Sequence, residues 1–253
     1  MLLDDVFSQL TFGELSQLYV SGRDEIGIQP CDYEKIIPHI NMGLTELHKR
    51  FDIKKNTVIV DQSFGLEKYP LHSKFAVSNV SSPEPNKYIL DTAGLPFQDD
   101  ILHIERIKDS FGNDLTINNP NNFIDVSSNG QFDYSFESDQ NNIPYPRTVY
   151  LPSYLTIQST YSNQDILTVG YRANHPKIAT VGLDLSTQEV DLPYGLYEPL
   201  LNYIAARVYT SMSEQDGGQY MQKFEMGCKK IEELGLENIV RPSNIKLDER
   251  GFV

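Results

Sequence analysis

The sequence of 253 residues is long enough for one large domain or two smaller ones, and with 40% hydrophobic and 22% charged residues it has the composition of an ordinary globular protein. No apolar run approaches the roughly 20 residues that a membrane helix needs, which argues against a membrane-spanning protein. The formal net charge of -14 argues against a nucleic-acid binder, because such proteins use lysine and arginine to displace counterions from phosphates.

The acidic charge has two interpretations. A well-solvated surface explains it most simply, and a surface that DNA must pass without sticking is the sharper alternative. The first ten residues carry Asp4 and Asp5 where a secretory leader would be basic, so we expect a protein kept in a cytoplasm-like compartment. There Cys31 and Cys228 should be free thiols, because two cysteines form neither a disulfide framework nor a closed metal site.

The N-terminal part is predicted to be helical. After Asp32, apolar residues recur at three- and four-residue steps, the period of one buried helix face. Asp32 is placed to cap the start of this helix. Residues 2–20 should form one or two short helices that break at Gly13. The apolar stripe after Asp32 comprises Tyr33, Ile37, Ile40, Leu44, Leu47 and Phe51.

Two further helices are predicted near the C-terminus. The first begins near Pro193 and ends in the turn at 214–218, where Gly217 and Gly218 stop it. The second closes at Gly235, which suits the left-handed position that follows a helix. A short glycine-containing link between amphipathic helices predicts an antiparallel helical hairpin. The two apolar stripes are Leu196, Leu200, Ile204 and Val208, with Leu201 and Ala205 beside them, and Tyr220, Phe224, Cys228, Ile231 and Leu234.

Between the helical parts the pattern changes to strands and turns. Residues 109–114, DSFGND, form a hairpin loop with Gly112 at its tip. Residues 118–146 are dense in Asn, Ser, Asp and Pro, which predicts an exposed excursion. Runs rich in β-branched and aromatic residues predict strands at 57–60, 101–108, 148–150, 155–160 and 166–171.

These elements predict an α+β protein. N-terminal helices and the C-terminal antiparallel hairpin should form one helical bundle, with an antiparallel β domain inserted between them and an extended C-terminal tail. The predicted boundaries are 1–56 for the N-terminal helical part, 57–190 for the β domain, 191–236 for the hairpin and 237–253 for the tail. The predicted bundle core is Ile37, Ile40, Leu44, Leu47, Phe51, Leu200, Ile204, Val208, Phe224 and Ile231.

The sequence lacks the familiar catalytic and metal-binding patterns. His39 and His48 lie nine residues apart, on opposite faces of one helix at about 100° per residue, and the other histidines are scattered. It has no GxSxG elbow and no phosphate-binding glycine loop. DVSSNG at 125–130 resembles the start of a calcium loop but has Phe136 where a glutamate is needed. We therefore predict no enzyme, no metal and no cofactor.

Four stretches share a pattern of apolar and turn positions with a known family. They are TFGELSQL at 11–18, YEKIIPHINMGLTELHKRFDI at 33–53, ILHIERIKDSFGNDLTIN at 101–118 with LTVGYRANHPKI at 167–178, and the hairpin at 192–235. The pattern resembles the head-to-tail adaptor, or tail-tubular, proteins of short-tailed bacteriophages, including crAss-like phages. Residues 118–146 have no counterpart in it.

The resemblance implies a virion structural protein at the head-tail junction, made in the host cytoplasm. Such a connector binds the portal protein, extends the DNA channel and provides the platform for downstream tail or nozzle proteins. The resemblance further implies a homo-oligomeric ring, a dodecamer that matches the portal, with genomic DNA only in transit and no membrane partner. A strongly negative ring would keep DNA from adhering.

The resemblance also implies that the C-terminal tail grips the portal. The tail is too apolar for a mere linker and too short to fold alone, as expected of a segment ordered on binding. The docking residues would be Ile239, Arg241, Ile245, Lys246, Leu247, Arg250 and Phe252.

Two other classes of protein stay open. A tail or baseplate module whose β domain recognises a receptor or glycan would commonly be trimeric or monomeric, whereas an adaptor would form rings of portal symmetry. A hydrolase of cell-wall material would lose an activity when His103, His175 or Asp125 is changed to alanine. Adjacent carboxylates, such as Asp99 with Asp100, are better explained as charged surface positions than as a glycosidase pair.

Overall fold

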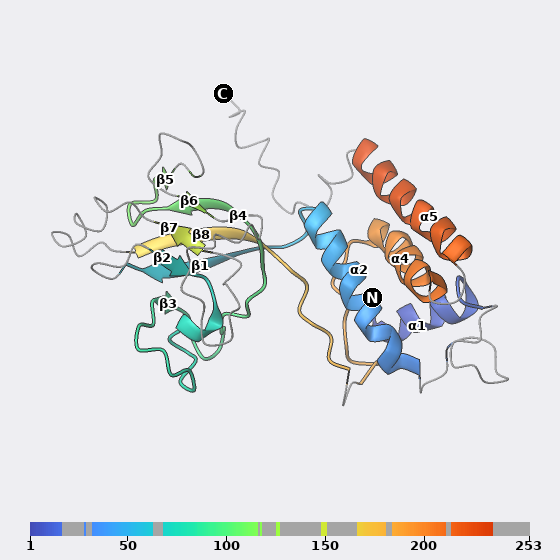
Figure 1. The fold of residues 1–253 in the computed structure, drawn as a ribbon, viewed down its shortest axis with the longest axis horizontal. Coiled ribbons are helices and arrows are strands. Elements are labelled where there is room, and N and C mark those ends of the chain that lie inside the picture. Colours follow the sequence, from blue (N-terminus) through green and yellow to red (C-terminus); the bar gives the residue numbers. More distant parts are fainter. Residues whose placement is uncertain are drawn as a thin grey trace, which may run out of the picture. The chain divides into compact units, whose positions relative to one another are not determined.

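The structure is a computed structural model that describes residues 1–16, 28, 32–62, 68–115, 117, 125–126, 148–150, 166–180, 184–210 and 214–234. These residues form four α-helices and an antiparallel five-stranded sheet, so the predicted α+β class is confirmed. The chain divides into two compact units, a helical unit of Met1–Lys54 with Asn174–Val253 and a β unit of Lys55–Ala173. Figure 1 labels the elements of each unit. No helix in the described ranges is long and apolar enough to cross a membrane.

The helical unit begins with helices that follow the predicted apolar periods. The first ends at Gly13, as predicted. The second starts without the predicted cap, because Asp32 has helical backbone angles and its carboxylate accepts from Lys35 Nζ at 3.1 Å instead. The helices of this unit are α1 (Leu3–Phe12), α2 (Tyr33–Arg50), α4 (Tyr197–Thr210), preceded by the 3₁₀ turn η4 (Tyr194–Leu196), and α5 (Glu214–Glu233).

Helices α4 and α5 lie side by side and antiparallel (Figure 1). The rings of Tyr209 and Tyr220 stack 5.0 Å apart, and those of Tyr203 and Phe224 meet at 5.2 Å. Residue numbers that rise along α4 therefore meet numbers that fall along α5, which is the geometry of a helical hairpin.

The predicted end of α4 at Gly217 and Gly218 is wrong. Helix α4 already ends at Thr210, and both glycines lie inside α5. A β-carbon on Gly217 would lie 2.3 Å from Thr210 Oγ1 and 2.8 Å from its backbone nitrogen. Gly217 is thus a point of close approach between two helices and not a helix terminator.

A single apolar core fills the described part of the helical unit and draws residues from all four helices. Ile231 is half-buried, whereas Leu234, which the sequence placed on the same stripe, is 61% exposed because it lies past the last residue of α5. Nine predicted core residues are at most 7% exposed: Ile37, Ile40, Leu44, Leu47, Phe51, Leu200, Ile204, Val208 and Phe224.

The chain returns from the β unit to the helical unit at Asn174. The boundary predicted from the sequence was residue 190. The side-chain amide of Asn41 in α2 donates to the backbone oxygen of Ile178 at 3.0 Å and accepts from its nitrogen at 2.9 Å. Further along, the Leu3 amide donates to Gln188 at 2.9 Å. These bonds attach the returning segment to α1 and α2.

The described residues of the β unit form two antiparallel sheets, with strand orders β3-β1-β8-β4-β5 and β2-β7-β6. Strands were found at four predicted positions, as β1, β4, β7 and β8, while the predicted strand at 155–160 lies outside the described residues. The remaining strands, β2, β3, β5 and β6, were not predicted; each has only two or three residues, too few to form a clear run of β-branched and aromatic residues. The strands are β1 (Lys55–Asp61), β2 (Lys68–Pro70), β3 (Ile89–Leu90), β4 (Ile101–Lys108), β5 (Asp114–Leu115), β6 (Asp125–Val126), β7 (Thr148–Tyr150) and β8 (Ile166–Ala173).

The predicted hairpin at 109–114 is confirmed. Ile107 pairs with Leu115 across β4 and β5, and Gly112 has φ +85°. Of the predicted excursion at 118–146, the structure describes only the two residues of β6, 125 and 126. Residues 237–253, with all seven predicted docking residues, lie outside the described part of the chain.

Candidate functional site

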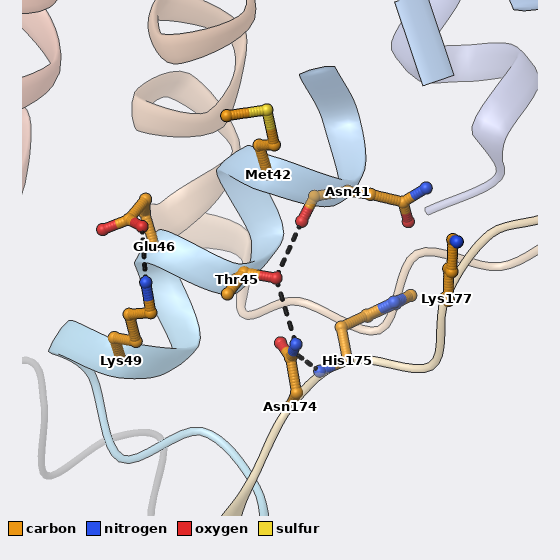
Figure 2. Close-up of a pocket in the computed structure, with 8 residues that line it drawn as sticks. All are labelled: Asn41, Met42, Thr45, Glu46, Lys49, Asn174, His175 and Lys177. Carbon is orange, nitrogen blue, oxygen red and sulfur yellow. Dashed lines mark hydrogen bonds and ion pairs between the residues drawn. The ribbon is translucent and has the colours of Figure 1, made fainter. Parts of the chain in front are cut away.

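The helical unit carries an open depression of about 420 Å³ on the outward side of α2, which we call the α2 depression (Figure 2). Helical positions three and four residues apart share one face, so α2 presents five of the lining side chains together. The segment after β8 supplies the rest. The lining residues are Asn41, Met42, Thr45, Glu46 and Lys49 from α2, with Asn174, His175 and Lys177.

Hydrogen bonds join the two walls of the α2 depression. Asn174 Nδ2 donates to Thr45 Oγ1 at 3.0 Å, and Thr45 Oγ1 donates to the backbone oxygen of Asn41 at 2.9 Å (Figure 2). Asn41 in turn holds Ile178, as described above. The depression is therefore a preformed feature of the fold.

The rim of the α2 depression is cationic in a chain whose net charge is -14. Lys49 and Lys177 are exposed on it, and Arg207 Nη2 lies 4.0 Å from Met42 Sδ. Glu46 is the acidic lining residue and pairs with Lys49 at 2.8 Å. Even with that pair, an excess of positive charge surrounds an opening lined partly by a methionine.

Buried histidines lie beneath this surface. His175 is 8% exposed and His48 is 1% exposed, and their rings meet edge to face at 5.9 Å. Burial lowers the pKa of His175, and the neighbouring Lys54 lowers it further against the opposing effects of the Pro176 carbonyl and Asp191. His175 is therefore neutral at pH 7.

The β unit uses carboxylates to hold its loops. Asp91 accepts from the Ser78 amide at 2.7 Å, from the Ser78 hydroxyl and from the Phe97 amide at 2.9 Å. Burial alone would raise the pKa of Asp91, but these hydrogen bonds outweigh it, so the pKa lies below its ordinary value. Asp99 likewise accepts from the amide and hydroxyl of Ser73.

The turn between β4 and β5, residues 109–114, is held in the same way, and we call it the β4–β5 tip. The Asp109 carboxylate accepts from the Phe111 amide at 2.9 Å and from the Asn113 amide at 2.8 Å and side chain at 3.0 Å. These bonds lower the pKa of Asp109, and the bond from the Asn113 side chain has the largest effect. The Phe111 side chain projects from this fixed turn and is 72% exposed.

A charged clamp ties the ends of two helices together. Arg50, the last residue of α2, donates to Glu225 of α5 at 2.7 Å and to Glu232 Oε2 at 3.2 Å. The hydrogen bond to Glu232 raises the pKa of Arg50 despite its partial burial, and the same bond lowers the pKa of Glu232. The C-terminal end of α5 is thereby fixed to the C-terminal end of α2.

No protein-family model matches the sequence, and no curated protein matches it.

The residues considered for a hydrolase do not form one described cluster. His103 is exposed on β4 in the β unit, and His175 lies in the helical unit. Asp125 belongs to β6, and its side chain lies outside the described part. Across the described ranges, no three His, Cys, Asp or Glu side chains are grouped so that they could hold a metal ion.

Adjacent carboxylates turn to different partners. Asp99 accepts from Ser73, whereas Asp100 accepts from Tyr171 Oη at 2.8 Å and from Asn56 Nδ2 at 3.1 Å. Both carboxylates thus act within the fold of the β unit. The sequence predicted charged surface positions here, because a local pattern does not show which distant groups donate to a carboxylate.

Cys228 is fully buried in the core of the helical unit, where the sequence placed it. Burial raises the pKa of its thiol to about 11, against the opposing effect of Arg50. The thiol therefore stays protonated at neutral pH and packs as a small apolar group.

Proposed function

We propose that this chain is a non-enzymatic virion structural protein, the connector subunit that joins the portal of a short-tailed bacteriophage to its tail. In this proposal the helical unit is a bundle made by both ends of the chain, the β domain is an insert within it, and residues 237–253 are an extended tail that docks on the portal. The four stretches of sequence resemblance are its starting point.

The observation that carries the proposal is the shared core of the helical unit. Residues near the start of the chain, such as Leu3 and Leu10, and residues near the end of its described part, such as Phe224 and Cys228, belong to one buried cluster. In this proposal the docking tail follows a helix that belongs to this shared core. A docking tail needs such an anchored base.

The Arg50 clamp supports the same assignment. It holds α5 at Glu225 and Glu232, within the last ten residues before the helix ends. A pull on the tail would therefore be transmitted to α2 as well as to α5.

The acidic charge also supports a connector. Repeating a charge of -14 around a closed ring produces a strongly negative object, and acidic residues that face a channel repel the phosphates of passing DNA. We expect negligible affinity for duplex DNA at physiological salt. A submicromolar gel shift would contradict the channel.

The direct test is capture on portal particles of the same phage. The full chain is expected to bind them, and a chain that ends at Gly235 is expected to lose binding, because the docking residues are gone. The charge-reversed variant Arg241→Glu with Arg250→Glu keeps the full length and should bind more weakly than the parent. Circular dichroism melting provides the control that each variant is folded. Equal capture by the truncated and full chains would count against the docking tail.

A further inference from the structure

The β4–β5 tip has the properties of an anchor that inserts into a partner. An exposed phenylalanine costs hydrophobic free energy, and Phe111 is 72% exposed on a turn whose backbone is held by the Asp109 carboxylate. Preorganised aromatic side chains of this kind dominate protein interfaces, since little conformational entropy is lost on binding. The tip also carries two carboxylates, Asp109 and Asp114, and with Lys108, which lies opposite Asp114 in the register of β4 and β5, this end of the hairpin keeps a net negative charge.

The α2 depression has complementary properties. It is large enough for an aromatic ring, at about 420 Å³, and its walls are held by the Thr45 and Asn174 hydrogen bonds. Lys49, Lys177 and Arg207 place positive charge around it. An acidic tip with an apolar end therefore matches a cationic rim with a partly apolar floor in both charge and shape.

We propose that the β4–β5 tip of one copy inserts Phe111 into the α2 depression of a second copy of this chain. Lys177 and Lys49 then face the carboxylates of the tip, while Met42 contacts the ring. The two surfaces belong to different units of the chain, so the contact is head-to-tail. Where this contact is not reciprocated, a dimer has one tip and one depression still open, and further copies add until a rotation closes the ring.

The inference stands on the geometry of the two surfaces and rests on the proposed function only for the closure of the ring. Capture on portal particles and self-association are separate measurements. A chain that binds the portal but never contacts its own copies through Phe111 would leave the connector assignment intact and overturn the tip-in-depression contact.

Sedimentation equilibrium of the full chain tests the contact. The wild-type chain is expected to self-associate with rising concentration, and Phe111→Ala is expected to weaken association at least roughly tenfold, the loss typical of an anchor residue. The matched control is Leu95→Ala, which removes an 82% exposed apolar side chain from another loop of the same unit and should change nothing. Equal behaviour of the two variants would overturn the proposal, as would a wild-type chain that stays monomeric at millimolar concentration.

Complementation shows whether the contact is head-to-tail. Phe111→Ala lacks the tip anchor but keeps the depression, and Met42→Asp blocks the depression but keeps the tip. Each variant alone should be monomeric, and an equimolar mixture should form one-to-one dimers that grow no further. A mixture that remains monomeric would show that the two surfaces do not bind each other.

A charge exchange checks the register of the same contact. Asp114→Lys and Lys177→Glu should each weaken association, and the chain that carries both changes should regain it. Failure of the double variant to recover, with both single variants folded, would remove Lys177 from the contact.

Discussion

The helical unit and the β unit each have an apolar core, and they differ in the contacts that are most prominent beside it. In the helical unit, helices approach closely at glycines: a β-carbon on Gly43 would lie 2.8 Å from Leu200 Cδ1, and one on Gly217 would meet Thr210. In the β unit, loops are fastened by carboxylates such as Asp91 and Asp109. The comparison shows that part of the net charge of -14 serves the fold itself.

The largest expected effect is a difference in stability between alanine substitutions at two neighbouring glycines of α5. Gly217→Ala should lower the free energy of unfolding by about 1–3 kcal/mol, because its β-carbon would overlap Thr210. Gly218→Ala is the matched control, since no atom lies within 4 Å of its added β-carbon, and it should raise stability by about 0.5–1 kcal/mol through helix propensity. Urea unfolding followed by circular dichroism measures both. Equal effects would mean that the glycine contact does not govern the packing of α4 on α5.

A carboxylate substitution should act on the β unit alone. Asp91→Ala leaves the Ser78 and Phe97 amides without their acceptor, which should cost about 1–3 kcal/mol. Hydrogen exchange should become faster at those amides while α2 and α4 keep their protection. Asp61→Ala, an exposed position of the same unit, serves as the control. Uniform loss of protection in both units would show that they unfold as one body.

The two units should also respond to acid in different pH ranges. The lowered pKa of His175 means that the unfolded chain binds a proton first as the pH falls below about 6.5, so the helical unit loses stability from there downward. The lowered pKa of Asp91 acts with the same sign, because this group too is deprotonated in the folded state: its contribution is present above about pH 3.8 and is lost as the pH falls below that value.

Thermal melts between pH 7 and pH 5 check this effect, the smallest of the three. The wild-type melting temperature should fall over that interval, and His175→Gln should flatten the fall, because glutamine does not titrate. The pKa of His39 is also lowered, mainly by burial and further by Arg207. This histidine should therefore leave some pH dependence of the melting temperature in His175→Gln. An unchanged slope in His175→Gln would exclude this histidine as a source of acid sensitivity.

Much of the candidate site lay beyond sequence reasoning for one reason. The DSFGND turn was predicted from its Asp, Asn and Gly residues, but the exposure of Phe111 depends on what covers a side chain, which no local pattern states. The α2 depression likewise joins α2 to residues that lie more than 120 positions later, through pairs such as Asn41 with Ile178. The prediction that α4 ends at Gly217 was wrong because a glycine ends a helix in one context and permits a close contact in another.

The sequence by itself determined the long elements: α2, α4 and α5 carry apolar residues at the period of a buried helix face, and β1, β4 and β8 are runs rich in β-branched and aromatic residues. Only the tertiary structure decided which loops the carboxylates hold, where Gly217 packs and where the chain returns to the helical unit. Those features depend on distances between residues far apart in the chain, and a distance of that kind is set by the packing of the whole core.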